Sequence, residues 1–184
     1  MEAQQFPEEA YVTFAGAIDH QAVQRVFAGF PIAVNNNVKR IHLAIHSLGG
    51  YISDGIAIHN YLRGLPIEIV TYNMGSVASI AVLFFLAGKV RKATRNATFM
   101  IHKTTFSFTA PMTAFDMRHR AETAELDDRN TDAIYRAFIT MPEDRWTMRE
   151  RADLTISAED AKTYGIIHAI GDFAPPPGNK VYNI

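Results

Sequence analysis

The sequence predicts an α/β fold built around a parallel β-sheet, and three observations support this. Short apolar runs of β-type residues alternate along the chain with segments of helical periodicity. Residues 77–87 are apolar almost throughout, which is typical of a helix buried against a sheet. The chain has 184 residues, 48% of them hydrophobic and 20% charged, so one domain over residues 1–184 can bury a core. Such alternation implies right-handed β-α-β crossovers.

The expected strands are short segments rich in β-type residues. In the second of them, Ile41, Leu43 and Ile45 alternate and therefore share one face. Pro111 ends the last and weakest one, because proline cannot donate to a strand ladder. The segments are residues 11–15, 40–46, 67–72, 98–102 and 104–109.

Helices are expected between the strands of the first half, with capping residues at several ends. Asp19 can cap the first helix, and Pro31 ends or kinks it. Ser53 can cap the second helix. A turn that begins at Gly75 leads into the third, which covers residues 77–87.

The second half begins with a long charged helix over about residues 113–139. Ser157 and Asp160 have the spacing of a capping box, and Gly165 is a plausible stop for the helix that they begin. The proline-rich residues 174–184 are expected to form a tail.

Composition excludes several classes of function. The 18 Lys and Arg residues and 19 Asp and Glu residues give a net charge of −1, which argues against a nucleic-acid partner. The absence of cysteine excludes disulfides, thiolate nucleophiles and Cys-ligated zinc. No signal peptide is visible, and the longest apolar run is shorter than the roughly 20 residues of a membrane helix. We therefore expect a cytoplasmic protein with no membrane partner.

Three motifs follow predicted strands, at the edge where α/β sheets usually place their sites. In Ser47-Leu48-Gly49-Gly50 the paired glycines can expose main-chain N–H groups, or simply form a tight turn. In residues 75–80 a serine lies at the positive end of a helix, where the Ile80 N–H can hold an oxyanion. Ser76 or Ser79 could instead only cap the helix. His102 can act as a base, although the chain has seven histidines and most histidines are structural.

Four ordered motifs together resemble the Clp protease proteolytic subunit family over about residues 11–171. They are Ser-Leu-Gly-Gly (47–50), Met-Gly-Ser-Val-Ala-Ser (74–79), Phe-Met-Ile-His (99–102) and Leu-Thr-Ile-Ser-Ala-Glu-Asp-Ala-x-x-Tyr-Gly-Ile-Ile (154–167). The resemblance implies a crotonase/ClpP-like fold of repeated β-α-β units, in which residues 113–139 form a protruding handle helix.

The resemblance also implies a serine endopeptidase that cleaves peptides and unfolded proteins. By motif position Ser79 matches the nucleophile, His102 the base and Asp153 the acid, while the N–H groups of Gly49 and Ile80 match the oxyanion hole. This chemistry requires no metal and no organic cofactor. The implied partners are further copies of the chain in a homo-oligomeric ring, with two stacked heptamers as one arrangement, and a separate AAA+ ATPase unfoldase.

The sequence departs from the family pattern in several places. Leu48 replaces a proline, residues 103–109 lack the usual glycines, and Arg151-Ala152 replaces an acidic-Arg pair that links rings. Few residues precede the first expected strand. These departures leave ring stacking and ATPase docking open, and they motivate an alternative: a catalytically silent scaffold subunit that pairs with an active paralogue.

Two other enzyme classes remain as alternatives. A crotonase-type acyl-CoA enzyme could share the fold, because a fold does not determine a function. A Ser-Lys peptidase could use Lys103, but neighbouring strand residues point to opposite faces, so His102 and Lys103 cannot easily both face Ser79.

Overall fold

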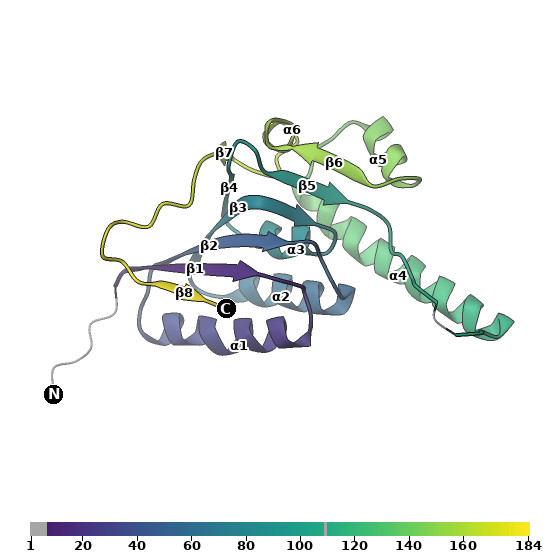
Figure 1. Ribbon diagram of the computed structural model, residues 1–184, viewed down its shortest axis with the longest axis horizontal. Coiled ribbons are helices and arrows are strands. Elements are labelled where there is room, and N and C mark those ends of the chain that lie inside the picture. The colour runs from purple at the N-terminus through teal and green to yellow at the C-terminus, as the bar shows by residue number, and fades with distance from the viewer. Residues whose placement is uncertain (1–6, 109) are drawn as a thin grey trace.

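The computed structural model describes residues 7–108 and 110–184 as a mixed α/β structure around one sheet (Figure 1). Within these residues the sheet has eight strands, ordered β6-β5-β3-β2-β1-β8, with β4 pairing with β3 and β7. The strands are β1 (Glu9–Ala15), β2 (Arg40–Ser47), β3 (Glu68–Ala78), β4 (Val90–Ala93), β5 (Thr98–Ile101), β6 (Leu154–Ser157), β7 (Ala169–Ile170) and β8 (Val181–Asn183). All pairs are parallel except β5 with β6. The expected α/β class is confirmed.

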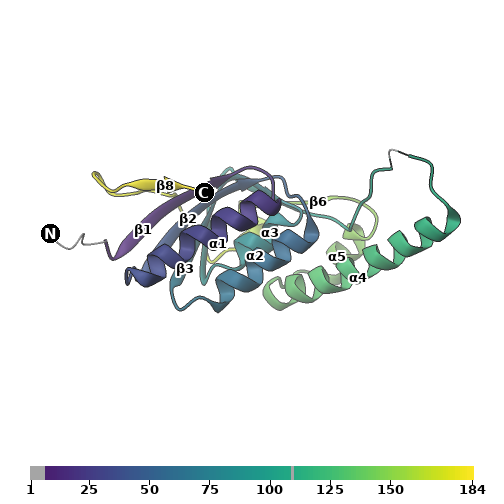
Figure 2. The same ribbon diagram turned by 90° about the horizontal axis from the view of Figure 1, so that it is seen from below.

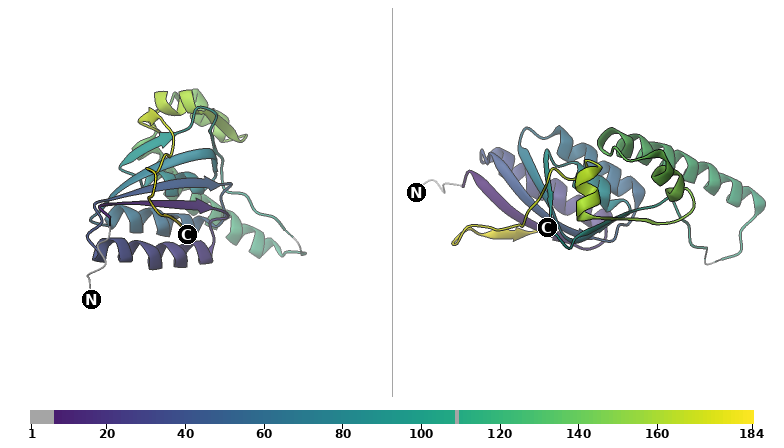
Figure 3. Two further views of the ribbon diagram at one scale, coloured as in Figure 1. Left: turned by 60° about the vertical axis from the view of Figure 1, so that its left-hand side comes forward. Right: turned by 90° about the horizontal axis from the view of Figure 1, so that it is seen from above.

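Helices α1 and α2 lie side by side on one face of the sheet, and α4 extends away from it (Figures 1 and 2). Helices α5 and α6 lie at the end of the sheet opposite α1 (Figure 3). The helices are α1 (His20–Asn35), α2 (Ile52–Gly64), α3 (Ala81–Leu86), α4 (Ala114–Phe138), α5 (Glu143–Arg149) and α6 (Ala158–Thr163). Among the described residues, none of these helices combines the length and apolarity needed to cross a bilayer.

Strand β3 divides the sheet into two branches. Its first half pairs with β4 through residues 70–73, and its second half pairs with β5 through residues 76–78. Asn73, fully buried at the fork, donates from its amide to the Thr98 carbonyl at 2.8 Å and accepts the Gly75 N–H at 3.0 Å. Both hydrogen bonds satisfy buried polar groups where the ladder changes partner.

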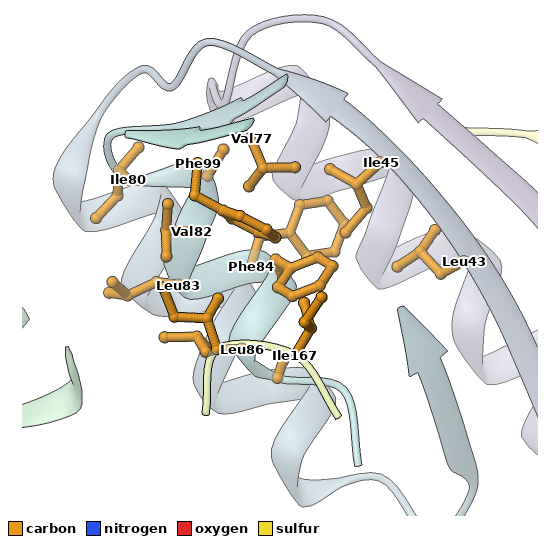
Figure 4. Close-up of a cluster of buried hydrophobic side chains, with 14 of the residues drawn as sticks. Leu43, Ile45, Val77, Ile80, Val82, Leu83, Phe84, Leu86, Phe99 and Ile167 are labelled. Carbon is orange, nitrogen blue, oxygen red and sulfur yellow. The ribbon is translucent and has the colours of Figure 1, made fainter. Parts of the chain in front are cut away.

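The core lies between the sheet and helices α1 to α3. All six residues of α3 are buried, as expected for the apolar segment in the sequence. Figure 4 shows side chains of α3 facing those of β2, β3 and β5 in this cluster. Burial of such side chains contributes roughly 1.5–3 kcal/mol each to folding, so α3 is held by its surroundings rather than by its own short hydrogen-bonded turn.

Two expectations about β3 and α3 are wrong. Gly75 does not begin a turn, because β3 continues through it to Ala78. The helix expected from residue 77 begins only at Ala81. The physical reason is the ladder with β5, which holds residues 76–78 extended and delays the helix.

Three smaller expectations need correction. Pro31 does not end α1, which continues to Asn35 because Phe30 and Ala33 keep its last turn packed on the core. Tyr51, not Ser53, is the N-cap residue of α2, and it caps without a side-chain bond. Residues 104–108 form no strand, since Thr104 is bonded instead to Asp128 of α4; residue 109 lies outside the described part.

Other local signals are confirmed. The Asp19 side chain accepts the Ala22 N–H at 2.8 Å, and the Ser157 hydroxyl accepts the Asp160 N–H at 3.1 Å. Gly165 follows α6 with φ of +77°. Beyond the prolines, residues 181–183 pair with β1 as strand β8, so this part of the expected tail belongs to the sheet.

His59 links α2 to α3 and α4 within the core. Its Nδ1 donates to the Leu83 carbonyl at 2.8 Å, and its ring packs edge-on against Phe138. Burial lowers the pKa of His59, and the hydrogen bond to Leu83 only partly opposes this. At pH values between the lowered pKa of the folded state and the ordinary pKa of the unfolded state, the unfolded chain therefore binds a proton at His59 that the folded chain does not.

We predict that this histidine makes the fold sensitive to acid. Its contribution to stability is complete above about pH 6.5 and is lost as the pH falls below that value towards the lowered pKa of the folded state. The midpoint of thermal unfolding, measured at a series of pH values, should fall less steeply with acidification in His59→Phe than in the parent. Equal slopes in the two proteins would contradict this role.

Candidate active site

The ladder between β3 and β5 brings Ser79 and His102 together. Ala78 is paired with Met100, and the Ser79 N–H extends the ladder by donating to the Met100 carbonyl at 2.7 Å. His102 follows β5 directly after Ile101. Both side chains therefore emerge where neighbouring strands end. The expected position of Ser79 in the first turn of a helix is wrong, because Ser79 directly follows β3 and precedes α3.

Ser79 has a left-handed backbone conformation, with φ of +55°. Among the described residues other than glycine, only Asn37 shares a positive φ. This conformation is uncommon for a residue with a Cβ atom, and such residues concentrate at functional sites. It forms a sharp bend between β3 and α3 that carries the serine at its apex.

Ser79 Oγ and His102 Nε2 are 2.7 Å apart, a hydrogen-bond distance. A serine hydroxyl is a weak nucleophile until a base can take its proton, so this pair has the geometry of an activated nucleophile. The structure thus joins two of the residues that the sequence singled out.

Asp153 lies opposite His102 because of the antiparallel pairing between β5 and β6. The last pair of that ladder is Ile101 with Leu154, so the next residues along, His102 and Asp153, face each other. Asp153 Oδ1 is 3.6 Å from His102 Nδ1, which is close enough for a charge interaction but longer than a hydrogen bond. The Asp153 side chain is 66% exposed, so water screens this interaction.

Gly49 lies against Ser79 and has φ of +106°. A Cβ atom at this position would be only 2.6 Å from Ser79 Cβ, so glycine is required for the close approach. The Gly49 N–H donates to Ser47 Oγ at 3.2 Å within its own loop. The Ile80 N–H, in contrast, has no hydrogen-bond partner among residues 7–108 and 110–184.

A cavity of about 250 Å³ opens beside Ser79 and His102. Its walls combine apolar side chains with hydroxyl groups. They are formed by Leu48, Gly50, Ile52, Ser79, Ile80, Met100, His102, Lys103, Thr104, Thr105, Thr131 and Tyr135. Ser79 therefore faces a space that can take a side chain of a bound molecule.

Lys103 is bound in an ion pair. Its Nζ contacts Asp132 Oδ2 at 2.8 Å and Glu150 Oε1 at 3.0 Å. Burial disfavours the cation, but the hydrogen bonds to Asp132 and Glu150 outweigh this effect and raise the pKa of Lys103. A lysine base must be neutral, so these contacts count against the Ser-Lys alternative.

Two residues that contact the backbone of this site, Tyr135 and Arg149, were not singled out from the sequence. The Tyr135 hydroxyl donates to the Ser79 carbonyl at 3.0 Å, and Arg149 Nη2 donates to the His102 carbonyl at 3.3 Å. Arg149 also pairs with Asp132. The only sequence signal was the helical spacing of Asp132 and Tyr135, which fits an exposed charged helix equally well.

An α/β sheet that places a serine on a strained bend, with a histidine at hydrogen-bond distance, has the geometry that hydrolases with a serine–histidine pair share. The sequence model described as Clp protease matches residues 2–173. The chain belongs to the Clp protease family, a family of serine peptidases.

Comparisons with individual proteins agree with this membership. The chain is 28% identical over 143 residues to an "ATP-dependent Clp protease proteolytic subunit" of Epifagus virginiana, which covers 76% of this chain and 71% of the relative. It is 27% identical, with the same coverage, to the protein of that name in Daucus carota. The fold is similar to that of a ClpP1 mutant from Listeria monocytogenes, with a TM-score of 0.77, 19% identity and coverage of 89% of this chain and 91% of that chain.

We predict that Gly49→Ala destabilises the protein, because the new methyl group would collide with Ser79 Cβ and strain the backbone at positive φ. The expected loss is about 2–4 kcal/mol in the free energy of unfolding, measured by urea denaturation. Gly64→Ala is the control, since a Cβ atom there would meet no described heavy atom within 4 Å. The control should change stability by no more than about 1 kcal/mol. Equal losses in both variants would contradict the close approach at Gly49.

Proposed function

We propose that this chain is an endopeptidase that cleaves peptides and unfolded proteins by acyl transfer, with Ser79 as the nucleophile, His102 as the base and Asp153 as the acid. The observation that carries the proposal is the 2.7 Å contact between Ser79 Oγ and His102 Nε2. It is supported by the bend at Ser79, which presents the hydroxyl beside an open cavity.

The reaction follows from the roles of these groups. Ser79 Oγ attacks the peptide carbonyl while His102 Nε2 takes its proton, and the resulting imidazolium then protonates the leaving amine. Water attacks the acyl-enzyme by the same route and releases the acid. Asp153 stabilises the cationic ring through its charge at 3.6 Å from Nδ1.

The proposed oxyanion donors are the N–H groups of Gly49 and Ile80. Gly49 lies against Ser79, and Ile80 directly follows Ser79 in the chain. The Gly49 N–H must exchange its bond to Ser47 Oγ for one to the oxyanion. This exchange is favourable because a hydrogen bond to a charged acceptor is roughly twice as strong as one to a neutral hydroxyl.

The proposal includes a homo-oligomeric ring that encloses the site, with stacking of two heptamers as one arrangement. Large apolar side chains are exposed on α1 and on the outer part of α4, a feature that favours burial between subunits. They are Phe27, Ile32, Phe115, Met117 and Leu126. The curated relatives are named as subunits of an ATP-dependent protease, which supports an AAA+ ATPase partner. The proposed location is the cytoplasm.

The nucleophile can be tested with a fluorophosphonate probe and a fluorogenic peptide. Ser79→Ala should abolish labelling and lower peptidase activity at least about 10³-fold, because the reacting oxygen is removed. The control is Ser76→Ala in the same motif, which should be labelled like the parent. Labelling at a residue other than Ser79, or no labelling of the folded oligomer, would overturn the assignment and favour a catalytically silent subunit.

The acid has a separate test. Asp153→Asn should lower kcat/KM about tenfold to a thousandfold, a smaller loss than in Ser79→Ala, because the carboxylate is exposed and acts through charge. The control for a general change of charge is Asp144→Asn, because Asp144 is also an exposed carboxylate but lies on α5. Equal activity of Asp153→Asn and the parent would remove Asp153 from the triad.

A further inference from the structure

One face of helix α4 is turned towards the candidate active site. Asp128, Asp132 and Tyr135 occur at intervals of four and three residues and therefore lie on the same side of the helix. Each of them contacts the chain at Ser79 or within two residues of His102. The outer part of the helix, in contrast, extends away from the sheet (Figure 1).

On the histidine side, three consecutive residues after β5 are fixed by α4 and α5. The His102 carbonyl accepts a hydrogen bond from Arg149 Nη2 at 3.3 Å. Lys103 Nζ binds Asp132 Oδ2 at 2.8 Å. The N–H and the hydroxyl of Thr104 both donate to Asp128 Oδ1 at 2.8 Å. This segment pairs with no strand in the described part of the chain, so these bonds determine its path.

On the serine side, the Tyr135 hydroxyl donates to the Ser79 carbonyl at 3.0 Å. Burial raises the pKa of Tyr135, so the hydroxyl keeps its proton and stays a donor. The bond holds the carbonyl of a residue whose left-handed backbone is otherwise unfavourable.

Arg149 connects the two sides. Its side chain is 1% exposed and forms an ion pair with Asp132. Its guanidinium carbon is 5.1 Å from the centre of the Tyr135 ring, within the range of a cation–π interaction. The buried Arg149 cation therefore has two contacts at the site. It lies over the ring of Tyr135, whose hydroxyl bonds Ser79, and it donates to the carbonyl of His102.

We propose that Tyr135, Asp132 and Arg149 are positioning residues that hold Ser79 and His102 at reacting distance. This inference rests on the proposed peptidase function of that pair. None of the three residues supplies a reacting atom. Tyr135 fixes the bend that carries the hydroxyl, and Arg149, oriented by Asp132, fixes the backbone that carries the imidazole.

A purely structural role makes a different prediction. A buried ion pair that only stabilised the fold would change the melting temperature and leave the reactivity of the folded enzyme unaltered. Positioning residues act on the transition state, so their loss lowers kcat and the rate of acylation while KM stays nearly constant. The separation of kcat from KM in folded, assembled protein distinguishes the two roles.

The test compares two conservative variants with two controls in the full-length oligomer. Tyr135→Phe removes one hydroxyl, and Arg149→Lys keeps the charge but changes the donor geometry. Tyr164→Phe and Arg136→Lys make the same chemical changes elsewhere, at the end of α6 and at the exposed ion pair of α4 with Glu143. Size-exclusion chromatography and circular dichroism select variants that fold and assemble. If Arg149→Lys fails to assemble, Tyr135→Phe alone decides the test.

The expected result is a fall of about tenfold to a hundredfold in kcat and in the rate of fluorophosphonate labelling at Ser79, with KM within about twofold. The controls should react like the parent. The proposal is overturned if Tyr135→Phe is acylated as fast as the parent, or if only KM changes. The ring-nitrogen NMR signals of His102, which report its bond to Ser79 without turnover, should also shift in the variant.

The outcomes separate the two proposals. A parent protein that is labelled at Ser79, together with variants that match it in rate and NMR signals, refutes the positioning role and leaves the peptidase function intact. A parent that shows neither labelling nor cleavage refutes the peptidase function and the positioning role for catalysis together.

Discussion

The main-chain ladder between the second half of β3 and β5 is the constraint on which the site depends. Ser79 and His102 are 23 positions apart in the sequence, yet each follows directly from a strand of this ladder. Peptide hydrogen bonds fix the separation of the two backbones, and the side chains need only span the remaining gap. The fork at Asn73 makes the ladder possible, because the buried amide satisfies the strand where it exchanges β4 for β5.

The surroundings of the site combine a rigid apolar side with a polar side. Next to the bend, the fully buried helix α3 belongs to the main hydrophobic cluster. Its close packing leaves no space into which Ser79 could shift towards the core. On the other side, charged groups of α4 and α5 enclose the segment after β5. Ser79 is thus held between close packing, which resists displacement, and directional hydrogen bonds, which set orientation.

Much of this arrangement can be predicted from the sequence. The alternation of strands and helices indicates the sheet, and the order of the motifs indicates Ser79 and His102. The start of α3 cannot be predicted in this way, because Val77 and Ala78 are apolar in a buried strand and in a buried helix alike. Strands β4 and β7 are too short to show a period.

The contacts of Tyr135 and Arg149 depend on tertiary structure. Their helices carry mostly polar residues, and nothing in their local pattern shows which side meets β5. The distance of Asp153 from the imidazole is likewise determined by strand register and by side-chain exposure, which no motif encodes.

Strand β8 has a consequence for the outer edge of the sheet. By pairing in parallel with Tyr11–Thr13, it occupies hydrogen-bonding groups of β1 that would otherwise attract a strand of a foreign chain. β8 itself is only three residues long and therefore offers little template for cross-β growth. The segment that follows the prolines thus covers the middle of the β1 edge with a short strand.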